Sequence, residues 1–230
     1  MKKKLVISTG AGISAESGIS TFRDADGLWE KYPVMEVCSA DGFERNPRLV
    51  HEFYNARRKG LFDVEPNAAH KGLVALEDKY DVYVITQNVD DLHERAGSKN
   101  ILHLHGELMK VRALDDETKV YQLTKENCET TPETVIDGHH VRPHIVFFQE
   151  AVPNIEPAVK LVEQADIFVV IGTSLNVYPA AGLLHYVRDN AEVFYIDPNP
   201  ASVPPRVHVI KAKATEGVEI LARQLQEMDK

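Results

Sequence analysis

A glycine turn close to the start of the chain limits the possible folds more than any other feature. A short apolar run at 5–7 leads into Gly10-Ala11-Gly12, which begins the pattern G-x-G-x-x-A. In mononucleotide-binding units the first glycine allows a tight strand-to-helix turn. The second lets backbone N–H groups approach a pyrophosphate at the helix N-terminus. Similar glycine clusters are often plain turns, so the pattern indicates an α/β fold and leaves ligand binding open.

The rest of the chain alternates strand-length apolar runs with helical segments. The apolar runs occupy residues 5–9, 81–86, 100–105, 144–148, 167–172 and 192–197. Continuous runs of this kind are typical of a parallel sheet covered on both faces. Helical segments lie between them, at 49–61, 68–79, 155–164, 179–188 and 215–228. The sequence therefore predicts a Rossmann-like, doubly wound parallel sheet of the α/β class.

Two polar segments interrupt this alternation, at 24–65 and 107–143. The first carries helix signals without a convincing strand, and the second is rich in charged residues and threonine. We interpret both as parts of a smaller inserted module. The prediction is one domain over 1–230, with a Rossmann-like core at roughly 1–23, 66–106 and 144–230 and a small module at roughly 24–65 and 107–143.

Composition excludes several classes of protein. The chain has 230 residues and a formal net charge of −9, with 35 acidic against 26 basic side chains, which disfavours a nucleic-acid partner. No apolar run is long enough to span a membrane, and the lysines at the start precede too few apolar residues for a signal peptide. The only cysteines, Cys38 and Cys128, suggest no disulfide framework. We expect a cytoplasmic monomer.

Polar side chains follow several predicted strands. Gln87, Asn88 and Asp90 come directly after the strand at 81–86, and Asp197 ends the strand at 192–197. The carboxyl ends of parallel strands border the crevice in which α/β folds bind ligands, and Asp197 is placed to accept hydrogen bonds from ribose hydroxyls. Structural alternatives stay open, because Asn88 or Asp90 could cap the next helix and Asp197 could belong to a turn.

Two histidines end the strand predicted at 100–105. Strand alternation places His103 and His105 on one face. A histidine on a strand is more often structural than catalytic. At a strand end beside a nucleotide crevice, however, a general base becomes a competing interpretation.

Taken together, four segments resemble the sirtuins, which are NAD-dependent protein-lysine deacylases. The segments are GAGISAESGISTFRDADGLW, TQNVDDLHERAG, LHLHGEL and IGTSLNVYPAAG. The resemblance covers most of the chain except roughly 107–141. It implies a Rossmann-like domain with a small helical and zinc-ribbon module and a ligand between them. It also implies that a cofactor loop follows the glycine turn in place of a second strand.

The resemblance implies a set of site residues and NAD as a consumed co-substrate. His105, as general base, and Asn88 would be catalytic. In the implied reaction the acyl-lysine oxygen attacks the anomeric carbon of the nicotinamide ribose, and the products are lysine, nicotinamide and O-acyl-ADP-ribose. A carboxylate at Asp197, where many relatives have asparagine, would repel a 2′-phosphate and so favours NAD over NADP. The implied cofactor contacts are Gly10, Ala11, Gly12, Ser14, Thr21, Phe22, Arg23, Gln87, Asn88, Asp90, Gly172, Thr173, Ser174, Asp197, Asn199 and Ala214.

The segment around Tyr54 and Arg57 bears on the acyl group. The two residues are three apart on a predicted helix and so share a face. In the sirtuin class that removes succinyl and malonyl groups, a tyrosine and an arginine at this spacing bind the acyl carboxylate. The structural alternative is that Tyr54 is a packed ring and Arg57 a solvent-exposed cation, with no role in binding. The resemblance also places Val146 and Phe148 against the substrate backbone, with Gln149 where the family commonly has glycine.

The chain departs from the family at the zinc cysteines. Ala113 stands where the first cysteine is expected, Cys128 has no nearby cysteine, and His139 and His140 stand near the second pair. One cysteine with adjacent histidines is a poor tetrahedral set, so we expect no zinc and no other metal. We expect apolar contacts to hold the module instead, from Val120, Tyr121, Leu123, Val135 and Ile136.

Three functions compete. The leading one is a zinc-free deacylase acting on acyl-lysine proteins or peptides, as a deacetylase, a desuccinylase or demalonylase, or both. A protein mono-ADP-ribosyltransferase would use the same cleavage of NAD. A non-catalytic NAD-binding module would explain the lost cysteines as decay, but the intact set of Asn88, Asp90 and His105 argues against it.

Overall fold

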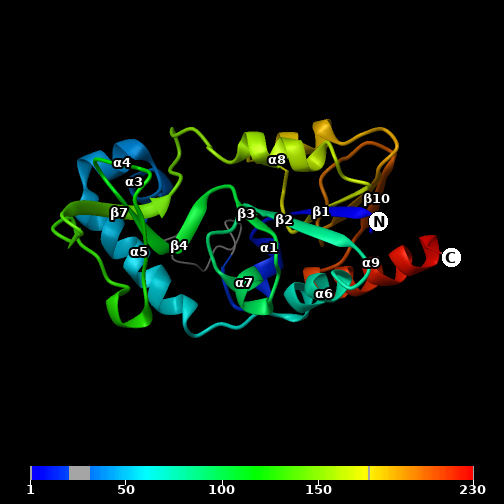
Figure 1. Cartoon of the computed structure of the whole chain (residues 1–230), viewed down its shortest axis with the longest axis horizontal. Helices are drawn as coiled ribbons and strands as arrows, with labels where there is room; N and C mark the ends of the chain where they lie inside the picture. Colours follow the sequence, from blue (N-terminus) through cyan, green and yellow to red (C-terminus); the bar gives the residue numbers. More distant parts are fainter. Residues whose placement is uncertain (1, 21–31, 176, 230) are drawn as a thin grey trace.

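A six-stranded parallel sheet forms the centre of the larger part of the molecule. The computed structural model describes residues 2–20, 32–175 and 177–229. The strand order is β10-β9-β8-β1-β2-β3, and every neighbouring pair is parallel. This arrangement confirms the predicted Rossmann-like fold class (Figure 1). The strands are β1 (Lys4–Thr9), β2 (Asp81–Thr86), β3 (Ile101–His103), β8 (Ile167–Ile171), β9 (Glu192–Ile196) and β10 (Val207–Ile210).

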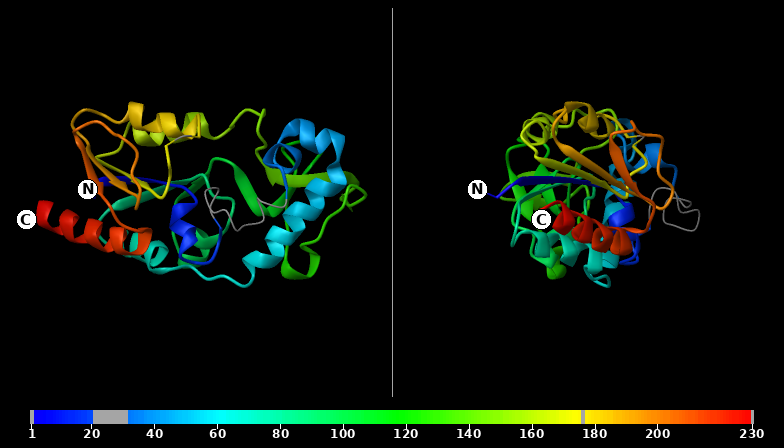
Figure 2. Two further views of the ribbon diagram at one scale, coloured as in Figure 1. Left: turned by 180° about the vertical axis from the view of Figure 1, so that it is seen from behind. Right: turned by 90° about the vertical axis from the view of Figure 1, so that its right-hand side faces the viewer.

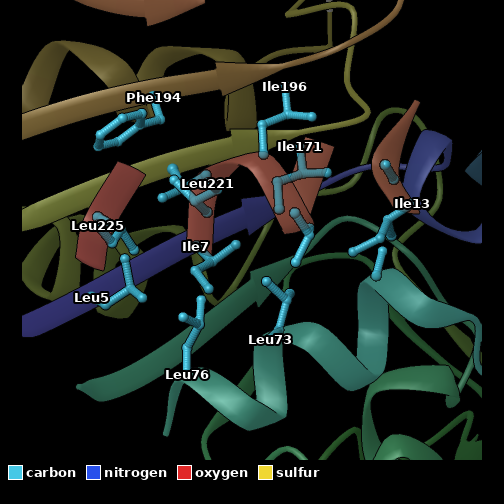
Figure 3. Close-up of a cluster of buried hydrophobic side chains, with 14 of the residues drawn as sticks. Leu5, Ile7, Ile13, Leu73, Leu76, Ile171, Phe194, Ile196, Leu221 and Leu225 are labelled. Atoms are coloured by element: carbon cyan, nitrogen blue, oxygen red, sulfur yellow. The ribbon is translucent and has the colours of Figure 1, made fainter. Parts of the chain in front are cut away.

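Helices cover both faces of this sheet, as a doubly wound fold requires. Because side chains alternate along β1, Leu5 and Ile7 pack on one face and Val6 packs on the other. The first face holds the cluster drawn in Figure 3, in which Leu73 and Leu221 lie against the strands. Figure 1 shows the helices of the two faces on opposite sides of the sheet. They are α1 (Gly12–Ala15), α6 (Ala68–Leu76) and α9 (Ala214–Met228) on the first face, and α8 (Ile155–Val162) and the 3₁₀ helix η2 (Ala180–Tyr186) on the second.

A smaller module lies at the far end of an elongated molecule from both termini (Figure 2). It combines helices with a four-stranded antiparallel sheet of order β5-β4-β7-β6. Its longest helix, α5, begins two residues before the predicted segment at 49–61, and the Asn46 side chain caps it by accepting a hydrogen bond from the Leu49 amide. Its elements are α3 (Val34–Val37), α4 (Ala40–Arg45), α5 (Pro47–Leu61), β4 (Gly106–Ala113), β5 (Val120–Gln122), η1 (Lys125–Asn127), β6 (Val135–Ile136) and β7 (His139–Ile145).

Several expectations about individual elements were wrong. The run at 144–148 is not a strand of the parallel sheet. Its first residues end β7, which pairs antiparallel with β4, and the rest forms a loop. The segment predicted as a helix at 179–188 is a 3₁₀ helix. The strand β10 was missed because His208 and Val209 are exposed on the edge of the sheet, so the segment lacks a continuous apolar run.

The interior of the module also differs from expectation. Val120 and Val135 are 39% and 51% exposed, so they do not hold the module together. Leu123 is buried as expected, in a cluster that also contains Val111 and Val141 from the two central strands. Tyr121 and Ile136 of the outer strands are partly buried and pack against the same cluster, as expected. Both the middle of the small sheet and one side chain from each outer strand therefore form this core.

Beside this cluster lies a buried cation, Arg58 of α5, with no measurable exposure. Its guanidinium donates to three neutral acceptors on two other segments. These are the Leu108 carbonyl at 2.8 Å, the Cys128 carbonyl at 3.2 Å and the Thr130 hydroxyl at 3.3 Å. A further bond reaches Asn55 within the helix. Burial lowers the pKa of Arg58 to about 10. One side chain thus joins α5, β4 and the segment after η1.

The glycine turn is bound to the strand beside it by direct backbone contact. Gly10 and Gly12 donate to the carbonyls of Ile171 and Gly172, at 2.9 and 2.8 Å. A β-carbon added at Gly12 would lie 2.6 Å from the Gly172 Cα, closer than van der Waals contact allows. Gly172 itself has a positive φ of 62°, a conformation that favours glycine. The protein's own packing therefore requires these glycines.

We predict that Gly12→Ala lowers the free energy of unfolding by about 1–3 kcal/mol, because the added methyl group overlaps the Gly172 backbone. Urea denaturation would measure this. Gly60→Ala is the matched control, since the same atom added at this position of α5 meets nothing within 4 Å. It should stabilise the protein by about 0.5–1 kcal/mol, because alanine favours helix. Equal midpoints for the two variants would contradict the steric explanation.

A second prediction concerns the buried cation. Arg58→Met should lower the unfolding free energy by about 2–4 kcal/mol, because it removes the donor from the buried Leu108 and Cys128 carbonyls. Arg48→Met, on the exposed side of the same helix, should change it by less than about 1 kcal/mol. A chelator should leave the wild-type midpoint unchanged. A lower midpoint on chelation would show that a metal stabilises the fold.

Candidate active site

The described candidate residues gather around one cavity of about 990 Å³ between the core and the module. The core contributes the glycine turn, the segment after β2, the ends of β8 and β9, and the start of α9. The module contributes α5 and the loop after β7. Thr21, Phe22 and Arg23 lie outside the described residues. All the others line the cavity: Gly10, Ala11, Gly12, Ser14, Tyr54, Arg57, Gln87, Asn88, Asp90, His105, Val146, Phe148, Gly172, Thr173, Ser174, Asp197, Asn199 and Ala214.

A buried polar network connects the glycine turn to the segment after β2. The Asn88 amide donates to the Gly10 carbonyl at 3.2 Å and to the Ser14 hydroxyl at 3.1 Å. Ser14 in turn donates to the Asp90 carboxylate at 3.0 Å. Burial raises the pKa of Asp90, although the Ser14 and Leu92 hydrogen bonds oppose this shift. Asp90 is thus held by hydrogen bonds to Leu92 on its own segment and to Ser14 just after the glycine turn.

The sequence left open whether Asn88 or Asp90 caps the next helix. Asp90 does accept from the Leu92 amide at 3.1 Å, at the start of α7 (Leu92–Ala96). The same side chain also reaches Ser14 through its other oxygen. Asp90 therefore caps α7 and also belongs to the polar network that lines the cavity.

The His105 ring reaches the cavity in a defined tautomer. Its Nδ1 lies 3.0 Å from the Gln87 carbonyl. A carbonyl only accepts, so Nδ1 carries the proton, and Nε2 of the neutral ring is a base. Burial lowers the pKa of His105, and the Gln87 hydrogen bond opposes this shift without reversing it. The lowered pKa keeps the ring neutral at neutral pH. This arrangement can accept a proton from a ligand hydroxyl.

The far end of the cavity is formed where β8 and β9 stop. Asp197 is 4% exposed, and its carboxylate accepts from the Asn199 amide at 2.8 Å. The expected turn is therefore present, and Asp197 lines the cavity as well. The Tyr195 hydroxyl donates to the Thr173 carbonyl at 2.9 Å and fixes the segment after β8. Nothing in the sequence pattern distinguished Tyr195 from an ordinary core residue.

The module end of the cavity brings together a tyrosine, an arginine and a thiol. The Tyr54 hydroxyl lies 3.4 Å from the Cys38 sulfur, and both side chains are buried. Burial raises the pKa of each, so both are neutral at neutral pH. The Arg57 guanidinium stands 5.6 Å from the centre of the Phe53 ring. Sequence analysis missed Cys38 as a cavity residue, because the sequence indicated only that the chain has two cysteines and no disulfide framework.

The loop after β7 borders the same cavity and is pinned on one edge. The Phe148 amide donates to the Cys38 carbonyl at 2.8 Å, and the Ala40 amide donates to the Phe148 carbonyl at 3.1 Å. Gln149 follows with a positive φ of 78°. Its side chain donates to the Asp41 carboxylate at 2.8 Å and accepts from the Asp41 amide at 3.2 Å. The Gln149 side chain thus lies against α4.

The residues near the expected zinc position do not fit a zinc site. Ala113 offers no ligand atom, and the Cys128 side chain lies in the apolar cluster of the module. Both ring nitrogens of His139 are engaged, with Asp115 at 2.8 Å and Lys119 at 2.7 Å. That the chain holds no zinc stays a prediction.

Within the described residues, one other group of possible ligands comes close together. It consists of Glu94, His103 and Glu107, whose ligand atoms lie within 4.8 Å of one another. Both ring nitrogens of His103 are already hydrogen-bonded, so this group offers a metal only its carboxylates. None of the helices in the described part of the chain is long and apolar enough to cross a bilayer.

Comparison with known proteins places this arrangement in a family. The model of the Sir2 family matches residues 10–179. This chain belongs to the Sir2 family. A relative from Bacteroides thetaiotaomicron, named NAD-dependent protein deacylase, is 57% identical over 229 residues, which cover 97% of this chain and 98% of the relative.

Two solved Sir2 structures are similar over nearly the whole chain. A complex of a Sir2 homologue with NAD is 37% identical, with a TM-score of 0.86, covering 99% of this chain and 91% of that one. A Sir2 protein with a deacetylated peptide and 3′-O-acetyl ADP-ribose is 31% identical, with a TM-score of 0.80, covering 97% and 94%. The family fold therefore extends across both the core and the module.

Proposed function

We propose that this chain is an NAD-dependent protein-lysine deacylase that transfers the acyl group to ADP-ribose and releases nicotinamide. One observation carries the proposal. The basic nitrogen of His105 and the glycine turn at Gly10–Gly12 belong to the same cavity. The full-length likeness to a protein named NAD-dependent protein deacylase supports this activity.

In this proposal, NAD lies along the core side of the cavity. Backbone N–H groups of the glycine turn bind the pyrophosphate, and the Asp197 carboxylate accepts from a ribose hydroxyl. Asp90 and Asn88 border the nicotinamide end, next to His105. Thr173, Ser174, Asn199 and Ala214 border the adenosine end, together with Gly172.

His105 is the general base of the proposed reaction. The acyl-lysine carbonyl oxygen bonds to the anomeric carbon as the bond from that carbon to nicotinamide breaks. His105 Nε2 then takes a proton from the ribose hydroxyls, so that the 2′-oxygen attacks the acyl carbon. Water completes the release of lysine and O-acyl-ADP-ribose. The lowered pKa keeps His105 in its basic form at neutral pH, and activity falls as the pH drops through that pKa.

Mass spectrometry of an acyl-lysine peptide incubated with NAD tests the function. We expect loss of the acyl mass with stoichiometric release of nicotinamide. His105→Ala should lower turnover by at least about 100-fold, since a general base contributes 10²- to 10⁴-fold. NAD binding, measured by calorimetry, should persist in that variant. ADP-ribose attached to a protein would favour the transferase alternative, and binding without turnover would favour the non-catalytic one.

The module end of the cavity supports an acidic acyl group as the substrate. Arg57 can grip a carboxylate with two parallel hydrogen bonds, and the Tyr54 hydroxyl can add a third. Because burial keeps Tyr54 and Cys38 neutral, no opposing negative charge from these two groups stands beside an incoming carboxylate. We infer that succinyl-lysine and malonyl-lysine are substrates as well as acetyl-lysine.

Arg57→Met should lower kcat/KM for a succinyl peptide by about 10- to 100-fold, the equivalent of ~1.5–3 kcal/mol for a hydrogen bond to a charged group. Deacetylation by the same variant should change by less than about threefold, because an acetyl group has no carboxylate to lose a partner. Arg48→Met, on the exposed side of α5, is the matched control. Equal losses on both substrates would refute the role of Arg57.

The peptide backbone is proposed to lie along the loop after β7. Val146 and Phe148 line the cavity, and the Phe148 backbone groups are already bonded to residues 38 and 40 on one side. An extended peptide would therefore pair with the opposite edge, as in strand addition. A cytoplasmic location, a monomeric state and the absence of nucleic-acid and membrane partners stay predictions.

A further inference from the structure

The other histidine of the LHLHG stretch, His103, has no part in the proposed reaction, yet it is 9% exposed and fully engaged. Its Nδ1 lies 2.9 Å from the Asn88 carbonyl, and its Nε2 lies 2.7 Å from a Glu94 carboxylate oxygen. Glu94 belongs to α7, nine positions before His103 in the chain and on a different element. The ring therefore bridges the helix and the segment that carries Asn88.

The acceptors define the protonation of the ring. The Asn88 carbonyl only accepts, so Nδ1 of His103 carries a proton. The Glu94 carboxylate is also an acceptor, so Nε2 carries a proton too, and the ring is an imidazolium. Burial lowers the pKa of His103, but the hydrogen bond and the charge of Glu94 outweigh it and raise the pKa above its ordinary value. The ring of His103 also interacts electrostatically with Glu107, Asp90 and His93.

The two histidines hold consecutive carbonyls of one segment. His105 donates to Gln87, and His103 donates to Asn88. Because β3 ends at His103 and His105 lies in the bend after it, strand alternation does not account for the placement of the two rings. The Asn88 side chain then contacts Gly10 and Ser14 in the glycine turn. A rotation of the His103 ring would break the hydrogen bond to the Asn88 carbonyl and so loosen the backbone that carries the Asn88 side chain.

We propose that Glu94 and His103 are a positioning pair for Asn88. Glu94 fixes the ring of His103, and the ring fixes the Asn88 carbonyl, so that the Asn88 amide stays aligned at the nicotinamide end of the cavity. Neither residue touches the reacting atoms. The inference rests on the proposed deacylase function for its kinetic consequences, but the ring contacts themselves are independent of that function.

Glu94→Ala and Glu94→Gln separate orientation from charge. Alanine leaves Nε2 of the ring without its partner, so the ring can turn away from the Asn88 carbonyl and kcat should fall about tenfold or more, as expected for misplaced catalytic groups. Inhibition by nicotinamide should weaken several-fold, whereas KM for the acyl peptide should stay within about twofold, because Tyr54, Arg57 and Phe148 lie on other segments. Glutamine can still hydrogen-bond the ring and should restore kcat to within about twofold of wild type.

Glu192→Ala is the matched control, because Glu192 pairs with His208 at 3.2 Å on the exposed surface. It should leave all three kinetic quantities unchanged. A Glu94→Ala enzyme with wild-type kcat and nicotinamide inhibition would overturn the proposal. A loss of kcat matched by an equal rise in peptide KM would also overturn it, since general distortion of the site gives that pattern.

The pair can be tested without turnover. Two-bond ¹H–¹⁵N spectra near neutral pH should show His103 as an imidazolium in the wild type and as a neutral ring in Glu94→Gln. Calorimetry should show weaker NAD binding for Glu94→Ala and near wild-type binding for Glu94→Gln. If the wild type lacks deacylase activity but gives these results, the proposed function fails and the positioning pair stands. A neutral His103 ring in the wild type would overturn the pair itself.

Discussion

The contact between the backbones of Gly12 and Gly172 determines where everything else in the site can lie. It joins the turn after β1 to the end of β8, two neighbouring strands of the parallel sheet. A side chain at either position would push the turn away from the sheet. The turn also anchors Asn88, through the Gly10 carbonyl and Ser14, so the same contact fixes the segment after β2. Three strand ends are thereby held in one arrangement around the cavity.

The module shows how a small unit can be held by one buried cation. Arg58 is fully buried, and backbone carbonyls, an amide and a hydroxyl accept from its Nε and Nη1, whereas its Nη2 has no hydrogen-bond partner among the described residues. Those acceptors come from segments far apart in the chain. Removal of the guanidinium would take the donor from the buried Leu108 and Cys128 carbonyls, and this dependence ties the small sheet to α5. The wall that carries Tyr54 and Arg57 is part of the same helix.

Sequence predicted the features of this structure that depend on neighbouring residues and missed those that depend on contacts between distant segments. The glycine turn and five strands of the parallel sheet were predicted, because each depends on neighbouring residues. The antiparallel placement of 144–148 was not, since an apolar run does not specify its partner strand. The bond between Glu94 and His103 depends on how α7 packs beside β3, and the place of Cys38 depends on the loop after β7. Local patterns contain neither piece of information.

Charge is distributed unevenly around the cavity, and this bears on how the site works. At the core end, burial lowers the pKa of His105, whereas Glu94 raises the pKa of its neighbour His103, whose two ring nitrogens both face acceptors. Two histidines two residues apart in the chain are thus held in different protonation states by the groups behind them. A base must be neutral to accept a proton, and a clamp with acceptors on both sides gains from being charged. The pairing of Glu94 with His103 rather than His105 is therefore what leaves the basic nitrogen in the cavity.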